Sequence, residues 1–268
     1  MVPAEGRSYP RIMSTTTGPD TPPTFDEGVR EGMPAPTELP DDLEAAPRLG
    51  PDSLTWKYFG DWRVHLFGFQ RIAGTENSIE QIEQGIRDHS VFFDDPIARA
   101  SRTARSVMRS IYSEDPYGWG RKVRDFHRDI KGEMPDASRY HALNPELWYW
   151  IHATFVDQLI YTTDTFIRRL SDDEKVRIFE ESKVWYELYG VSSRSQPQSY
   201  AEFCTYLDEM LDRLAATPTV RYATGYLRQG IPGPRWMPKP IWRVVSVPVN
   251  AAVQTVIIGT IPPQLRAV

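Results

Sequence analysis

The sequence is poor in the patterns that mark several common protein classes. Its single cysteine, Cys204, excludes an internal disulfide, and the first twenty residues lack the continuous apolar run of a secretory signal. A net charge of −5 gives none of the basic footprint that nucleic-acid-binding domains carry. We therefore expect a protein of a reducing compartment, cytoplasmic or attached to a membrane face, that does not bind nucleic acid.

Motifs of several enzyme classes are missing as well. The chain has no glycine-rich phosphate loop, no nucleophile elbow and no internal repeat. The close-spaced cysteines and histidines typical of structural zinc sites are absent too. Strand signals are absent throughout, whereas helical spacing of apolar residues recurs, so the sequence predicts an all-α fold.

Proline content divides the chain into two regions. Residues 1–50 are interrupted by Pro19, Pro22, Pro23, Pro34, Pro36 and Pro40, too often for a helix or strand to bury much surface. From Pro51 onward large apolar residues become dense, with nine of them in the sixteen positions from 54 to 69. We predict a disordered or surface-draped arm over residues 1–50 and one helical domain over residues 51–268.

The stretch from Tyr117 to Leu170 predicts two helical segments, each with a histidine on its apolar face. In the first segment His127 shares the helical spacing of Val123 and Ile130. Basic residues, Arg124 and Arg128 among them, occupy the flanks of that face. His127 is therefore expected to point inward from a basic rim.

After a loop that the turn residues predict from Gly132 to Leu143, the second segment carries its own start signal and its own histidine. Asn144 and Pro145 read as an N-cap and a first helical residue, so a helix should begin there and run to about Leu170. Along it His152 falls on an apolar stripe with Trp148 and Phe155. The sequence thus predicts a second imidazole in the interior.

Two inward histidines on consecutive helices allow two interpretations. Each could be a core histidine whose ring nitrogens bond to a carbonyl or a hydroxyl. Alternatively, the pair marks a metal or haem centre between helices, in which a neutral imidazole ligates iron and arginines, here Arg124 and Arg128, pair with the propionates. Zinc fits less well, because four suitable ligands are not clustered in this sequence.

An acid and several arginines lie near this region. Ser78 is expected to cap a helix that carries Glu83 on its apolar side, where the carboxylate either pairs with a cation or acts as a base in a low-dielectric pocket. A helix opening at Asp95 and Pro96 places Arg99 and Thr103 on one face. The arginines of this helix either form a solvated flank or point at a haem propionate or bound oxygen; they are Arg99, Arg102, Arg105 and Arg109.

The glycines and prolines from Gly230 to Pro240 predict a loop, and the last apolar stretch follows it from Ile241 to Ile261. It approaches the ~20 residues that a membrane span needs, but Pro248, Asn250 and Gln254 interrupt it. These interruptions favour a buried helix or one lying on a membrane surface. Peripheral membrane contact is therefore among the expected interactions.

Five local motifs, in this order and spacing, resemble one protein family over residues 54–266. They are Asp88-His89-Ser90 before Asp95-Pro96, Arg99-x-x-Arg102-Thr103, Val123-Arg124-x-x-His127, Tyr140-x-Ala142-x-Asn144-Pro145-Glu146-Leu147, and Trp150-Ile151-His152-Ala153-Thr154. The family is that of the haem-binding oxygenases, which includes the MpaB oxygenase of mycophenolic-acid biosynthesis and the latex-clearing rubber oxygenases. The resemblance implies an all-α fold with a globin-like core, haem b, and oxidative cleavage of carbon-carbon double bonds in apolar chains by dioxygen.

The resemblance also implies roles for particular residues. His127 matches the axial iron ligand, and His152 is either the opposite ligand, a hydrogen-bonding partner or a structural residue. Arg99, Arg102 and Thr103 match a distal motif in which the rubber oxygenases have a lysine where this chain has Arg102. A guanidinium cannot lose its proton to ligate iron, so a lysine-capped resting state is not available here. The resemblance also places Glu83 near the position at which the rubber oxygenases have a catalytic base.

These residues predict one function and leave two alternatives. We expect a haem b-dependent oxygenase that acts with dioxygen on an apolar, unsaturated lipid or isoprenoid. The first alternative is a non-catalytic haem sensor or carrier, in which His127 and His152 both ligate iron and leave no open position. The second is a helical scaffold that binds lipid and no haem.

Overall fold

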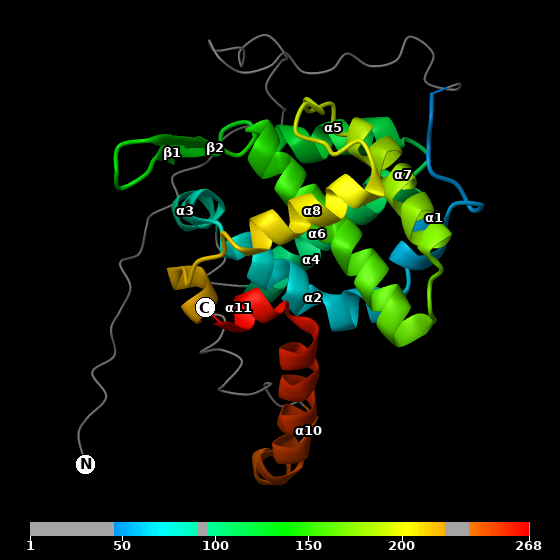
Figure 1. The fold of residues 1–268 in the computed structure, drawn as a ribbon. Helices are drawn as coiled ribbons and strands as arrows, with labels where there is room; N and C mark the ends of the chain where they lie inside the picture. The colour runs from blue at the N-terminus through cyan, green and yellow to red at the C-terminus, as the bar shows by residue number, and fades with distance from the viewer. Residues whose placement is uncertain (1–45, 91–95, 223–235, 268) are drawn as a thin grey trace.

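A computed structural model describes residues 46–90, 96–222 and 236–267 of the chain (Figure 1). The described part is mostly helical, which confirms the predicted all-α class; a globin-like arrangement of the helices stays a prediction. In chain order the elements are α1 (Leu54–Phe59), α2 (Trp62–Asn77), α3 (Glu80–His89), α4 (Pro96–Tyr112), α5 (Pro116–Asp125), β1 (Lys131–Glu133), β2 (Arg139–His141), α6 (Pro145–Thr162), the π-helical turn η2 (Thr163–Ile167), α7 (Asp172–Glu187), α8 (Tyr200–Leu211), α10 (Lys239–Thr260) and α11 (Pro263–Ala267).

Helix α6 forms the centre of the domain, with α2, α7 and α8 around it (Figure 1). Its start follows the prediction, because the Asn144 side chain accepts a hydrogen bond from the backbone of Glu146 and Pro145 occupies the first turn. Gln158 donates to the carbonyl of Val64 on α2, at 3.0 Å. Twelve of its eighteen residues are buried, so α6 packs on nearly all sides.

The ends of α7 also follow the sequence signals. Ser171 and Glu174 form a reciprocal capping box at its start. After its last turn Gly190 adopts a φ of +64°, which glycine reaches without the steric cost that other residues incur. A Cβ at Gly190 would also meet the Arg121 guanidinium at 2.6 Å, so the chain is tightly packed at this turn.

Three local predictions were wrong. Helix α5 ends at Asp125, so His127 lies in the turn that follows and not within a helix. The predicted loop contains an antiparallel hairpin, β1 paired with β2, whose three-residue strands are too short to show alternation. Ile79, not Ser78, is the N-cap of α3, because the Ser78 hydroxyl donates to the carbonyl of Gly74 instead.

The N-terminal and C-terminal parts of the described chain differ in how much of their surface is buried. Residues 1–45, most of the predicted arm, lie outside the described residues, while Ala46 and Leu49 are already buried in the core. No residue of the most apolar window of helix α10 is buried, so of the two predicted settings for this stretch the buried one was wrong and the membrane-surface one stays a prediction. The helix is continuous through Pro248 and extends away from the rest of the domain (Figure 1). Most of the loop predicted between Gly230 and Pro240 lies outside the described residues.

Candidate active site

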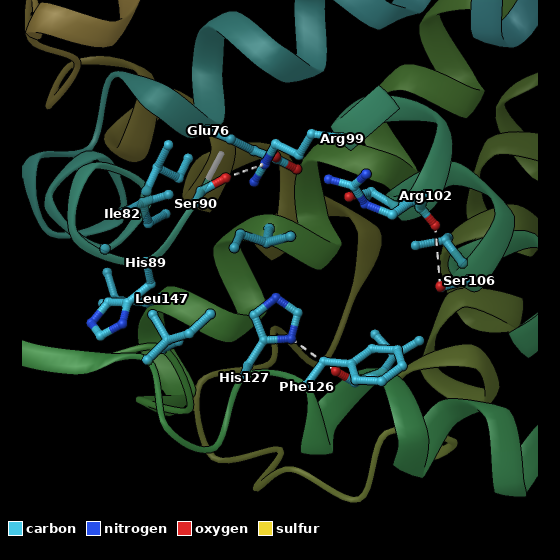
Figure 2. Close-up of a pocket in the computed structure, with 18 of the residues that line it drawn as sticks. Glu76, Ile82, His89, Ser90, Arg99, Arg102, Ser106, Phe126, His127 and Leu147 are labelled. Carbon is cyan, nitrogen blue, oxygen red and sulfur yellow. Dashed lines mark hydrogen bonds between the residues drawn. The ribbon is translucent and has the colours of Figure 1, made fainter. Parts of the chain in front are cut away.

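A cavity of about 670 Å3 lies between α3, α4, α5 and the start of α6. Figure 2 shows His127 and Leu147 on one side of it and the α4 arginines on the other. Its size is typical of a site for a small molecule or cofactor. The apolar part of its wall consists of Ile82, Ile86, Val107, Val123, Phe126, Ile130, Leu147 and Ile151.

His127 is held so that one ring nitrogen faces this cavity. Its Nδ1 lies 2.8 Å from the backbone carbonyl of Val123, which can only accept, so Nδ1 carries the proton. Among the described residues no hydrogen bond uses Nε2, and the ring points toward Arg99 in Figure 2. Desolvation lowers the pKa of His127, and the nearby charge of Arg99 acts in the same direction, against the Val123 carbonyl. A neutral imidazole with a fixed tautomer and a lone pair aimed into a cavity is suited to ligate a metal.

Four arginines of α4 line the cavity, and all of them except Arg99 are also exposed to solvent. They are Arg99, Arg102, Arg105 and Arg109, and Thr103 lines the cavity with them. Arg99 donates from Nε to the hydroxyl of Ser90 at 3.2 Å, and burial lowers its pKa. Arg109 and Lys122 both lie over the ring of Trp119, 4.5 and 4.7 Å from its centroid. This wall can bind anionic groups at the cavity's edge.

Glu76, on α2, is a site residue that the sequence reasoning missed. Its carboxylate lines the cavity beside Arg99 (Figure 2) and accepts a hydrogen bond from the Thr154 hydroxyl at 3.0 Å. Desolvation raises the pKa of Glu76 to about 7, although Thr154 and Arg99 both oppose the rise. The signal was present in the sequence: Glu76 lies one helical turn after buried Ile72, on the inward face of its helix.

Glu83 is buried but does not line the cavity. Its carboxylate accepts a hydrogen bond from the Thr219 hydroxyl at 3.1 Å and lies 3.6 Å from Arg87. Of the two interpretations of an inward glutamate, the structure favours the paired one for Glu83. The carboxyl group that the cavity offers belongs to Glu76.

His152 lies in a different environment from His127. It is 2% exposed, its Nε2 lies 3.0 Å from the carbonyl of Ser182, and its Nδ1 has no partner among the residues that the structure describes. Desolvation lowers the pKa of His152 to about 3. Its ring is surrounded by other rings and does not line the cavity; these neighbours belong to Tyr149, Trp185, Tyr186 and Tyr189. The structure does not bring the two histidines together.

The predicted propionate partners also lie away from the cavity wall. Arg124 and Arg128 both pair with Asp125, at 2.8 and 3.0 Å, behind the turn that carries His127. The basic residues that line the cavity are instead the α4 arginines and Lys122. Within the described ranges no cluster of three His, Cys, Asp or Glu side chains could hold a metal ion by itself, so His127 alone would supply an axial ligand.

The chain was then compared with known proteins. Residues 56–268 match the family model described as ER-bound oxygenase mpaB/B'/Rubber oxygenase, catalytic domain. This match covers most of the chain. The protein belongs to the mpaB and rubber oxygenase family. Neither the curated proteins nor the solved structures contain a significant match.

Family membership gives the cavity its chemical context. The family is one of oxygenase catalytic domains, so the chain is placed among oxidoreductases. Four of the motif residues that carried the resemblance, Arg99, Arg102, Thr103 and His127, come from two separate segments and line the same cavity. The residues of the Trp150-Ile151-His152-Ala153-Thr154 motif do not all face the cavity. Ile151 lines it, whereas Trp150 and His152 are buried and do not.

Proposed function

We propose that this member of the mpaB and rubber oxygenase family is a haem b-dependent oxygenase, which uses dioxygen to oxidise an apolar, unsaturated lipid or isoprenoid. One observation carries the proposal: Nε2 of His127 faces an apolar cavity while Nδ1 is held by the Val123 carbonyl. A family of oxygenase domains supports the reaction class. The haem and the substrate are our inference.

The residues around the cavity are suited to bind both the iron and the propionates of a haem. His127 would ligate the iron through Nε2, and the Val123 carbonyl would keep the ring in the required tautomer and orientation. The cavity-lining arginines of α4, together with Lys122, would pair with the propionates. A bound haem would supply the redox-active iron that reacts with dioxygen.

Glu76 is the group best placed to hold or move a proton in this site. A carboxyl group with a pKa of about 7 is present in both protonation states near neutral pH, which a general acid or base requires. The hydroxyl of Thr154 fixes the carboxylate from α6, and Arg99 lies at its other side. We propose Glu76, in place of Glu83, as the acid-base group of the site.

The cavity wall favours an apolar, chain-like substrate. Burying an unpaired polar group costs about 1–3 kcal/mol, whereas each buried methylene contributes roughly 0.8 kcal/mol. Besides its polar residues, the lining is rich in aliphatic side chains and includes Phe126. Phe126 is 57% exposed, so it lies where a ligand would enter from solvent.

A haem sensor or carrier with two histidine ligands gains no support from the geometry. That alternative needs His127 and His152 on opposite sides of one iron, but the rings of Trp148 and Tyr189 lie between them, each in edge contact with the next. His127 alone would therefore hold the haem, and a bound haem would supply the iron that reacts with dioxygen.

The proposal is tested with purified protein reconstituted with haem. We expect a haem absorption spectrum, carbon monoxide binding to the reduced form, and oxygen uptake with at least one member of a panel of unsaturated lipids and isoprenoids. Carbon monoxide binding without any oxygen uptake or lipid-induced spectral shift would favour a carrier. The absence of haem binding would overturn the proposal.

A matched pair of variants tests the substrate site. Phe126→Ala should weaken lipid binding about tenfold, because the side chain lines the cavity, while carbon monoxide binding is kept. Phe69→Ala is the control: Phe69 is 44% exposed on α2 and does not line the cavity. An equal loss in both variants would contradict this placement of the substrate.

A further inference from the structure

Helix α10 is an apolar helix that extends away from the domain and is attached to it at its C-terminal end. By length and composition it could cross a membrane, and no residue of its most apolar 18-residue window is buried. Its C-terminal end is fixed: Arg71 of α2 donates to the carbonyl of Thr260 at 2.9 Å, and Tyr161 of α6 donates to that of Gly259 at 3.2 Å. An exposed apolar surface of this size usually marks an interaction site.

Five polar residues of α10 lie on one side of the helix, while Thr255 and Thr260 lie elsewhere. Lys239, Arg243, Ser246, Asn250 and Gln254 are spaced by three or four residues, so they form one narrow stripe. Ser246, Asn250 and Gln254 on this stripe are half-buried. The opposite side is apolar and exposed along its length; its residues are Ile241, Val244, Val245, Pro248 and Ala252.

The charge of the C-terminal part of the chain, which contains α10, indicates an anionic partner. Residues 213–268 contain seven arginines and lysines and no aspartate or glutamate, although the whole chain has a net charge of −5. Exposed Trp236 precedes the helix, at the position where membrane proteins enrich tryptophan. An apolar helix face with cations at its edge and no acids is complementary to the surface of an anionic membrane.

The connections of α10 exclude a membrane span. On its N-terminal side, Thr217 donates to the carbonyl of Asn77 at 2.6 Å, so the chain is bound to the domain before the helix as well as after it. If α10 crossed a bilayer, residues 223–238 would have to cross it back. That stretch includes Arg228, Gln229 and Arg235, which are costly in hydrocarbon, and it is too short to form a second apolar span. A helix that lies in one membrane surface satisfies both anchors.

We propose that α10 lies in the plane of a membrane that contains anionic lipid. Its exposed side, with Ile241, Val244 and Val245, enters the acyl region, while Lys239 and Arg243 reach the headgroups along their aliphatic stems. This inference does not depend on the haem, and it places the domain where apolar substrates partition.

The test is flotation of the full-length chain with vesicles of phosphatidylcholine, alone or mixed with phosphatidylglycerol. The protein should float with the mixed vesicles and much less with the neutral ones. Ile241→Asp combined with Val244→Asp should weaken binding by about tenfold or more, because both side chains are over half exposed and enter the lipid. Lys239→Gln and Arg243→Gln should each weaken binding to the mixed vesicles about fivefold.

Val176→Asp is the matched control, since Val176 is exposed on α7, away from α10. It should leave flotation unchanged, and all variants should keep the wild-type melting temperature. Flotation that is absent with both vesicle types, or reduced equally by Val176→Asp, would overturn the proposal. If light scattering instead detects a dimer that the α10 substitutions dissociate, with no vesicle binding, the exposed side is an interface between two copies of the chain.

Discussion

His127 and His152 follow similar sequence patterns but lie in opposite kinds of interior. The turn after α5 presents His127 to a cavity of about 670 Å3, with Nε2 directed into it. His152 occupies the middle of α6, where rings from α6 and α7 surround it and the carbonyl of Ser182 takes up one nitrogen. One imidazole is available for chemistry, while the other belongs to the packed core.

The difference shows what an apolar face can predict. Helical spacing indicates that a residue points inward, but the opposite wall decides whether the inward side is a cavity or packed side chains. For His152 that wall consists of Trp185, Tyr186 and Tyr189, more than thirty residues later in the sequence. For His127 it consists of the arginines of α4, which come before it.

The largest expected effect is on stability, from removing the packed histidine. His152→Ala should lower the free energy of unfolding by about 3 kcal/mol, since a fully buried ring is replaced by a cavity and the Ser182 carbonyl loses its partner. His127→Ala should cost about 1 kcal/mol or less, because its ring faces a space that is already open. Denaturant unfolding measures both, and similar losses would contradict the distinction between the two environments.

A second effect concerns the pH dependence of stability, which Glu76 should influence. The folded-state pKa of Glu76, about 7, lies above its ordinary value of 4.5, so the folded protein binds the proton more tightly than the unfolded chain. Its favourable contribution is therefore full below pH 4.5 and is lost as the pH rises to 7. Glu76→Gln, which cannot ionise, should remove a loss of about 2 kcal/mol between pH 5 and pH 8.

The contribution of His152 to stability should depend on pH in the opposite direction. Burial depresses the pKa of His152 to about 3, so its contribution is present above pH 6.5 and is lost as the pH falls. The Glu76→Gln variant should keep this acid-side loss. Unfolding free energies of the wild type and of Glu76→Gln, measured from pH 4 to pH 8, separate the contributions of Glu76 and His152. If both proteins show the same pH dependence above pH 5, the pKa of Glu76 is not raised.

The smallest expected effect comes from the hydroxyl that orients Glu76. Thr154→Val removes a hydrogen bond that lowers the pKa of Glu76, so the pKa should rise by less than about one unit, equivalent to under ~1.4 kcal/mol. The pH window of the Glu76-dependent loss should move upward accordingly. Thr75→Val is the control, because the Thr75 hydroxyl donates only to carbonyls of α2. A downward shift, or the same shift in both variants, would argue against contact between Thr154 and Glu76.

Much of the fold could be predicted because its signals are local. The caps at Asn144 and Ser171 and the glycine stop at Gly190 each depend on a few neighbouring residues. The hairpin from Lys131 to His141 could not, because two paired strands of three residues depend on contacts with each other rather than on an apolar pattern. The end of α5 at Asp125 was missed because apolar spacing continues past it to Ile130.

The site was predictable in its cations and its histidine, but not in its acid. Arg99, Arg102 and Thr103 could be placed together because they share one face of one helix. Choosing Glu76 over Glu83 required knowing which side of α2 and α3 faces the cavity, which depends on how these helices pack against α6. The same dependence decides which arginines line the cavity: those of α4 do, whereas Arg124 and Arg128 pair with Asp125.

The most direct test of the central claim is the absorption spectrum of His127→Gly, recorded after haem reconstitution with and without added imidazole. If His127 is the axial ligand, the variant should lose the wild-type haem spectrum, and imidazole should restore it by occupying the vacated position. His152→Gln, which keeps a side chain of similar length in the core, should retain the spectrum. A wild-type spectrum in His127→Gly without imidazole, or its loss in His152→Gln only, would contradict the account.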